Sequence, residues 1–168
     1  MRWQGIANLQ VWLSRLGAAI VVASLLFAST VRAGEIDDLT RNIPRGFLGE
    51  FSWEGDPTVQ NVVITFDSVR VLNEQNAEAL GCGSYEVGRN VTKIKVRMFV
   101  RWPDLNVEIF ELAPEGNSSF ETGGSHRGRL SPDFQRIDTE WTTTSSGQRG
   151  ELHLRALPAV TCAPASEM

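Results

Sequence analysis

The residues that could carry chemistry are few in this chain and lie far apart. His126 and His153 are the two histidines, and neither belongs to a close group of His, Cys and carboxylate residues with the spacing of a metal site. We therefore expect no metal, no cofactor and no catalytic constellation, and we interpret each histidine as a solvated strand residue. Gly123-Gly124 precedes a predicted strand rather than a helix, so it indicates a turn and not a phosphate-binding loop.

Glu111 is the carboxylate with the strongest claim to a functional role. It follows Val107 and Ile109 at the spacing that turns side chains to one face of a strand. If the strand is still in the core at this point, the carboxylate lies in an apolar wall and needs a partner or a raised pKa, as in many ligand-binding and catalytic sites. If the strand has already left the core, Glu111 meets water. A hydrolase that uses Glu111 would need a second polar group beside it.

The two cysteines, Cys82 and Cys162, offer a choice between a reactive thiol and a disulfide. Gly81-Cys82-Gly83-Ser84 is similar to the surroundings of a thiol-protease nucleophile, but such a thiol needs a histidine within reach. Oxidising surroundings outside the cell favour a disulfide instead. We expect a bond between Cys82 and Cys162 that ties the C-terminal tail to an early hairpin and constrains the unfolded chain.

A hairpin in the middle of the chain must position Glu111. From residue 93 to 102, one set of alternate residues is apolar and the other is mostly basic, which is the period of a half-buried strand. Residues 103–106 indicate a turn, and residues 107–112 form the returning strand. The apolar set is Ile94, Val96, Met98, Val100 and Trp102, and the outward set is Lys93, Lys95, Arg97, Phe99 and Arg101.

With residues 103–106 as the loop, every cross-strand pair of this hairpin is chemically matched. A shift by one residue would place charged side chains against the apolar set, so this register is preferred. The expected pairs are Trp102 with Val107, Arg101 with Glu108, Val100 with Ile109 and Phe99 with Phe110.

Strand signals recur along the chain at the spacing typical of sandwiches and barrels. Alternation is lost around Ser68-Val69-Arg70, which indicates a bulge, and Gly81 and Gly83 mark a bend or a close backbone approach. Further strands are expected near residues 47–53, 62–72, 77–87, 137–143 and 150–157, with short extended pieces at 119–122 and 125–130 and a short helix near 35–43. The predicted fold is all-β: an antiparallel meander of about eight strands that closes into a barrel and leaves no edge open.

The first residues predict an export signal. Arg2 and Arg15 flank the start of an uncharged apolar run that is shorter than the ~20 residues needed to span a bilayer, and Val31-Arg32-Ala33 offers small residues for cleavage. We expect residues 1–33 to be a signal peptide, 34–157 a single barrel domain and 158–168 an irregular tail. The mature protein would be periplasmic or extracellular, without stable membrane insertion; the alternative is an uncleaved membrane anchor.

The mature chain is acidic. Loss of residues 1–33 removes three of the 16 basic residues and none of the 20 acidic ones, which changes the formal net charge from −4 to −7. Nucleic acids and anionic membrane surfaces reward clustered positive charge, so neither is an expected partner.

The order of these elements resembles that of calycin-type barrels, the lipocalin and avidin architecture. The matching residues are Gly49, Phe51 and Trp53 on the first strand, where those proteins have a Gly-x-Trp signature, and Arg155 on the last strand. Phe51 stands in the place of the signature Trp, and Trp53 comes two residues late. The resemblance implies a short N-terminal helix, a barrel, and a basic residue packed over the first-strand aromatic residue; it assigns no ligand residue.

Two functions are consistent with this scaffold. The first is a non-enzymatic barrel that binds a small apolar molecule inside. The second is a module that contacts another exported protein through the outward pair Phe99 and Phe110 with Arg97 beside it, since two exposed aromatic side chains form an apolar patch. The expected ligand-binding residues are Val96, Met98, Val100, Trp102, Ile109, Glu111 and Trp141.

Overall fold

The computed structural model describes residues 36–112, 121–143 and 147–158. The chain divides at Glu35, and the unit that begins at Ile36 contains every described element. The predicted signal peptide, Cys162 and the tail after residue 158 lie outside the described residues. In the part that is described, no helix has the length and apolar composition required to cross a membrane.

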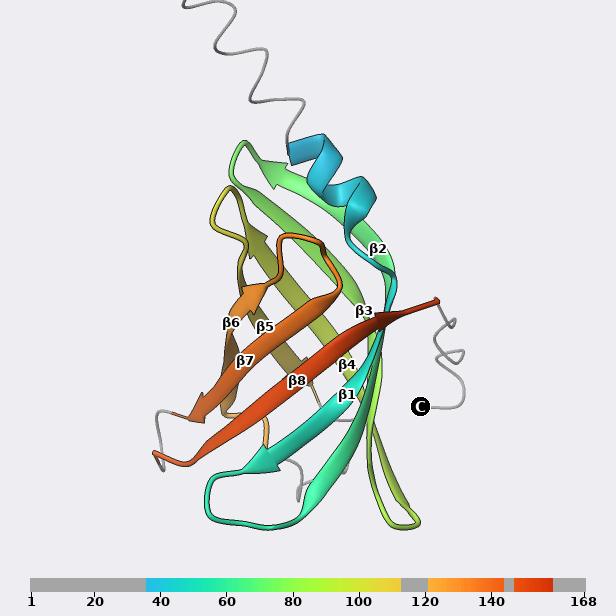
Figure 1. Ribbon diagram of the computed structural model, residues 1–168, viewed down its shortest axis with the longest axis vertical. Coiled ribbons are helices and arrows are strands. Elements are labelled where there is room, and N and C mark those ends of the chain that lie inside the picture. Colours follow the sequence, from blue (N-terminus) through green and yellow to red (C-terminus); the bar gives the residue numbers. More distant parts are fainter. Residues whose placement is uncertain (1–35, 113–120, 144–146, 159–168) are drawn as a thin grey trace, which may run out of the picture. The chain divides into compact units, whose positions relative to one another are not determined.

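Eight antiparallel strands form a closed barrel in sequence order (Figure 1). They are β1 (Gly46–Trp53), β2 (Val59–Asn73), β3 (Asn76–Val87), β4 (Asn90–Arg101), β5 (Asn106–Leu112), β6 (Gly124–Leu130), β7 (Arg136–Thr143) and β8 (Arg149–Leu157). Each strand pairs with the next, and β8 pairs with β1, so the described wall has no free edge. The predicted all-β meander and its closure are confirmed.

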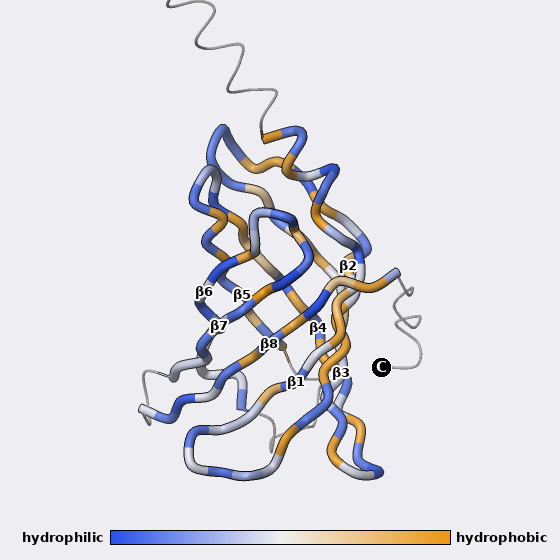
Figure 2. Tube along the Cα trace, in the orientation of Figure 1, coloured by the Kyte–Doolittle hydropathy of each residue, from blue (hydrophilic) through white to orange (hydrophobic). Residues whose placement is uncertain are grey.

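Alternation along the strands fills the barrel. On β4, the inward residues Ile94, Val96, Met98 and Val100 are at most 3% exposed, whereas the basic residues between them are exposed. Figure 2 shows hydrophobic and hydrophilic residues alternating along the strands. Because burial of one such aliphatic side chain stabilises a fold by about 1.5–3 kcal/mol, this alternation is the main force that holds the wall around its core.

The hairpin of β4 and β5 forms with a register two residues away from the predicted one. Its loop is residues 102–105 instead of 103–106, because Leu105 turns into the core, is 8% exposed, and accepts a 2.9 Å hydrogen bond from the Leu130 amide. The four predicted pairs are therefore wrong. An even shift leaves each side chain on its predicted face. The observed pairs are Arg101 with Asn106, Val100 with Val107, Phe99 with Glu108, Met98 with Ile109 and Arg97 with Phe110.

The irregular positions of β2 and β3 lie where the sequence predicts them. Phe66 pairs with Gly81 and Ser68 with Leu80, so Asp67 is left over as a bulge. A Cβ atom at Gly81 would lie 1.8 Å from the carbonyl oxygen of Thr65, which confirms the predicted close approach of two backbones.

The two ends of the barrel differ. A short helix, residues 36–42, precedes β1, and its apolar residues Ile36 and Leu39 are buried in the core, as predicted (Figure 1). Leu105 is buried at the same end, which we call the covered end. The opposite end, where β1 ends and β8 begins, contains the cavity described next, and we call it the cavity end.

Candidate functional site

Three buried polar side chains meet inside the barrel at the cavity end. They are Tyr85 of β3, Glu111 of β5 and His126 of β6, which are 5%, 6% and 1% exposed. The Tyr85 hydroxyl donates a hydrogen bond of 2.5 Å to Glu111 Oε1. His126 Nε2 lies 3.2 Å from the same oxygen and 3.4 Å from the Tyr85 hydroxyl. We call these three residues the buried polar cluster.

Strand alternation turns each member of the cluster inward. Glu111 faces Val96 of β4, and His126 lies between Ile109 of β5 and Trp141 of β7. Of the two alternatives for Glu111, the interior position is therefore correct. The interpretation of His126 as a solvated residue is wrong.

The inward positions of His126 and Tyr85 were not predicted from the sequence, although the pattern of neighbouring residues indicates each of them. On β6 the outward pair Arg127 and Arg129 alternates with His126 and with the buried Leu130, so the same parity turns the histidine inward. On β3 the buried Ala77 and Ala79 share parity with Tyr85, but Gly81 and Gly83 interrupt the apolar pattern between them.

The environment of Tyr85 suppresses its ionisation. Burial, followed by the nearby charge of Glu111 and the hydrogen bond to it, raises the pKa of the Tyr85 phenol well above its ordinary value of 10.0. The phenol thus remains a hydrogen-bond donor to the carboxylate across the physiological pH range.

One ring nitrogen of His126 has no hydrogen-bond partner among the described residues. Because the Glu111 oxygen accepts hydrogen bonds, we assign the ring hydrogen of His126 to Nε2, which leaves Nδ1 as an acceptor in the neutral imidazole. Nδ1 is buried and has no hydrogen-bond partner in the described part of the chain. A buried polar atom without a partner costs about 1–3 kcal/mol, so a donor that reached this atom would relieve that cost.

A cavity of about 180 Å³ adjoins the cluster. Its aromatic rings meet edge to face: the ring centres of Phe51 and Trp53 are 4.8 Å apart at 87°, and those of Trp53 and Trp141 are 4.9 Å apart at 90°. The lining residues are Phe51, Trp53, Gln60, Tyr85, Glu111, Glu121, His126 and Trp141. They come from β1, β2, β3, β5, β6 and β7 together with the segment before β6, so the closed wall itself assembles the site.

Gly150 makes room for the three rings. It pairs with Trp53 on one side and Trp141 on the other. A Cβ atom at this position would lie 2.4 Å from Cζ of Phe51. Any larger residue would push the Phe51 ring toward the cavity.

The predicted ligand-binding residues divide into two groups. Glu111 and Trp141 line the cavity. The residues Val96, Met98, Val100 and Ile109 belong to the packed hydrophobic core, and Trp102 is half-buried in the loop after β4 and packs against that core. The cavity therefore lies nearer the cavity end than most of the predicted ligand-binding residues do.

A second buried carboxylate lies on the outside of the wall. Glu78 of β3 is 1% exposed and accepts hydrogen bonds from Nε of Arg70 at 2.7 Å and Nε of Arg97 at 2.6 Å, and the second guanidinium nitrogen of each arginine also contacts it. Burial alone would raise the pKa of Glu78, but the two arginines outweigh burial, and the pKa is lowered. This carboxylate is covered by its own salt bridges.

The outward aromatic pair of the hairpin is adjacent, as predicted. The ring centres of Phe99 and Phe110 are 6.0 Å apart at 82°, and Phe110 is 36% exposed. The Arg97 guanidinium lies 4.6 Å from the centre of the Phe99 ring. Since Arg97 is also bound to Glu78, its charge is largely engaged within the wall.

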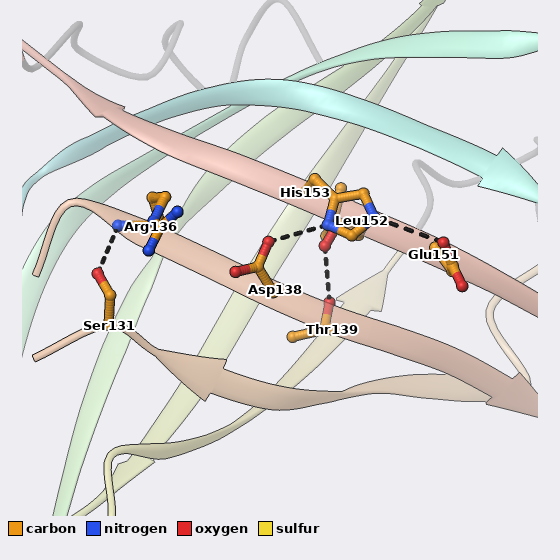
Figure 3. A network of polar contacts seen from close by, with 7 residues as sticks. All are labelled: Ser131, Arg136, Asp138, Thr139, Glu151, Leu152 and His153. Atoms are coloured by element: carbon orange, nitrogen blue, oxygen red, sulfur yellow. Dashed lines mark hydrogen bonds and ion pairs between the residues drawn. The ribbon is translucent and has the colours of Figure 1, made fainter.

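His153 lies on the outer face of β8, as predicted. Its ring contacts Asp138 of β7 at 2.9 Å and Glu151 at 3.5 Å (Figure 3). The hydrogen bond that His153 Nδ1 donates to Asp138 is the largest contribution that raises the pKa of His153, and burial opposes it. The three side chains are between 59% and 72% exposed, so they form a solvated cluster rather than an enclosed site.

One contact implied by the calycin resemblance is absent. Arg155 is exposed and faces Leu48 on β1, whereas Trp53 faces Gly150 at the other end of the same strand pair. Arg155 therefore does not pack over Trp53.

The chemistry available at the cavity is hydrogen bonding and proton exchange. Among the described residues, its lining contains neither Lys nor Arg, and neither Ser, Thr nor Cys. Within the described ranges, no group of three or more His, Cys, Asp or Glu residues is arranged to hold a metal ion.

No family model matches this chain, and neither a curated protein nor a solved structure matches it.

Proposed function

We propose that this protein is an exported, non-enzymatic barrel of the calycin type that binds a small molecule at its cavity end, with the apolar body of the ligand against the aromatic rings. The observation that carries the proposal is the cavity, whose lining combines Trp53 and Trp141 with His126, a residue whose buried Nδ1 has no partner in the described chain. Ligand sites combine apolar and aromatic walls with a few convergent polar groups, and this cavity has that composition.

The size of the cavity limits the ligand. A volume of about 180 Å³ is close to that of an apolar cavity of about 150 Å³ that holds benzene in another protein, and it is below the usual range for drug-sized ligands. The ligand is therefore of single-ring size.

A cavity-filling substitution tests the proposal. Gln60→Phe places a ring in the cavity and should weaken binding of single-ring probes at least tenfold, measured by calorimetric titration of the purified protein. Asn61→Phe is the matched control, because Asn61 is the exposed neighbour of Gln60 on β2. If Gln60→Phe and Asn61→Phe bind a probe equally, the cavity is not the binding site.

A hydrolase is the competing function for the same site. Tyr85 and His126 supply the second polar group that this hypothesis requires beside Glu111. Because the described lining residues include no Ser, Thr or Cys, this hypothesis uses water as the nucleophile. We expect the native protein and Glu111→Gln to hydrolyse a small activated ester at the same background rate. If the rate falls a hundredfold in the variant, the protein is a hydrolase and the binding proposal is wrong.

The alternative function, contact with another exported protein, rests on the outward pair Phe99 and Phe110, of which Phe99 is half-buried and Phe110 is exposed. Replacing both residues by Ser should abolish an association measured by sedimentation of the native protein. The buried core should be unaffected, because both rings project from the outer face of the wall.

Export and the disulfide are parts of the same proposal. Cys82 lies half-buried on β3, in the wall of the barrel. The protein recovered from cells that express the full chain should begin at Gly34, and its intact mass should be two hydrogens lighter than that of the fully reduced form. A chain that retains residues 1–33 would contradict the signal peptide. Two free thiols before reduction would contradict the disulfide.

A further inference from the structure

The cavity has a marked bias in its side chains. Four of its eight described lining residues, Phe51, Trp53, Tyr85 and Trp141, carry aromatic rings. Two others, Glu111 and Glu121, are acids. The remaining two, Gln60 and His126, add no fixed positive charge, and this described part of the lining contains no Lys or Arg.

We propose that the ligand of this cavity is a small protonated amine, held with its charge among the aromatic rings and its N–H group directed to Nδ1 of His126. This inference rests on the proposed function and specifies the chemical class of the ligand.

The arrangement of the rings suits a cation. A cation is attracted to the face of an aromatic ring, most strongly to that of Trp. Phe51 with Trp53, and Trp53 with Trp141, form perpendicular pairs. In such a pair one ring points its edge at its partner, so the partner covers neither of that ring's faces. A stacked pair would instead cover one face of each ring; Phe51 also meets Tyr85 and His126 edge to face, with ring centres 5.8 Å apart.

The two carboxylates select against other ligands. Glu111 is buried, and its near neighbours are the Tyr85 hydroxyl and His126, so among the described residues it has no Lys or Arg to balance its charge. Glu78 on the outer wall has two arginines for the same purpose. An anionic ligand would be repelled by Glu111 and Glu121 together, whereas a positive charge would balance the buried carboxylate.

His126 distinguishes among cations. With its ring hydrogen on Nε2, its Nδ1 can accept but not donate, and this atom is buried without a partner in the described chain. A protonated amine carries N–H donors that meet this need. A quaternary ammonium group does not.

Four probes that share one ring test the inference. Benzylamine should bind, benzyl alcohol about tenfold more weakly, benzyltrimethylammonium more weakly than benzylamine, and benzoate not at all, by calorimetric titration of the native protein at neutral pH. Benzyl alcohol bound as tightly as benzylamine would overturn this inference and leave the proposed function standing. Benzyltrimethylammonium bound as tightly would overturn the assigned role of His126, and failure of all four would overturn both proposals.

Charge-neutral variants locate the charge. Glu111→Gln should weaken benzylamine at least tenfold and leave benzyl alcohol within about twofold. Glu108→Gln, a glutamate on the outer face of the same strand, should change neither. Glu121→Gln alters an exposed residue of the lining, and we expect it to weaken benzylamine a few fold without affecting folding. Equal benzylamine affinity in the native protein, Glu111→Gln and Glu121→Gln would exclude a cation site.

Discussion

Glu78 and Glu111 are two buried carboxylates of one barrel, and their surroundings differ in kind. Glu78 lies on the outer face of β3 beneath Arg70 and Arg97, each of which contacts it through two nitrogens. Glu111 lies on the inner face of β5 and meets a phenol and an imidazole next to a cavity. The first carboxylate has its full complement of charge partners within the wall. The second has hydrogen bonds but lacks a permanently charged partner among its described neighbours.

The difference separates a structural role from a ligand-binding one. Burial of a charge is costly, and a fold tolerates it when paired groups offset the cost. Two arginines offset it at Glu78, so we expect that residue to stabilise the wall. At Glu111 the compensation is partial, and the unpartnered nitrogen of His126 lies on the same cluster. Sites that bind ligands tolerate such local costs because the ligand removes them.

The strongest challenge to this comparison is to remove the partners of Glu78. The double substitution Arg70→Met and Arg97→Met keeps the aliphatic cover but leaves a buried charge unpaired, so we expect the free energy of unfolding to fall by about 2–3 kcal/mol in urea denaturation. Ligand affinity at the cavity should be unchanged. Adding Glu78→Leu should restore most of the lost stability; if it does not, packing of the arginine stems and not charge pairing explains the loss.

A smaller effect should appear in acid. The pKa of Glu78 is lowered in the folded state, so its contribution is present above the ordinary value of 4.5 and is lost as the pH falls through that value toward the lowered one. As the pH falls through this window, the urea midpoint of the native protein should decline more steeply than that of the triple variant Glu78→Leu, Arg70→Met and Arg97→Met. Identical slopes would remove the salt bridges as the cause.

Titration of Tyr85 sharpens the other half of the comparison. Tyr85 is the one tyrosine in the sequence, so the ultraviolet absorbance of tyrosinate reports this residue alone. Its raised pKa means that its contribution to stability is present below its ordinary pKa of 10.0 and is lost as the pH rises from there through the raised value. In Glu111→Gln the pKa of Tyr85 should fall, because the carboxylate charge and the hydrogen bond to it both raise that pKa. An unchanged pKa would show that burial alone suppresses ionisation.

The smallest effect is expected at His153, because its side chain and that of Asp138 are each 59% exposed. Asp138→Asn should lower the raised pKa of His153, followed by nuclear magnetic resonance of the imidazole. The stabilisation from the protonated form is present below its ordinary pKa of 6.5 and is lost as the pH rises through the raised value. Because these groups are exposed, the change in unfolding free energy should stay within about 0.2–1 kcal/mol.

Sequence periodicity predicts most of the wall, because a strand must alternate when one face is buried and the other is wet. The inward set of β4 follows from this rule, and so does the parity that Glu111 shares with Val107 and Ile109, but alternation alone does not decide whether the strand is still in the core at Glu111. The register of the hairpin does not follow, because the loop is decided by where Leu105 packs, which is a tertiary contact. Two registers that differ by two residues present the same faces, so the pattern cannot separate them.

The cavity was harder to predict for a similar reason. Its residues come from six of the eight strands, and their convergence depends on barrel closure and on the absence of side chains at Gly150 and Gly124. His126 and Tyr85 lie on strands in which arginines or glycines blur the apolar pattern. Parity counted from Leu130 and from Ala79 would have turned both inward.

The seam between β1 and β8 has a consequence for biosynthesis. Gly46 pairs with Leu157, so the first and last strands of the wall meet after nearly the whole barrel sequence has left the ribosome. Contacts between such distant positions make folding slow, and a shortened product without β8 would display two unsatisfied strand edges, on β1 and β7. Such nascent or truncated chains are natural substrates for chaperones and proteases until the last strand docks.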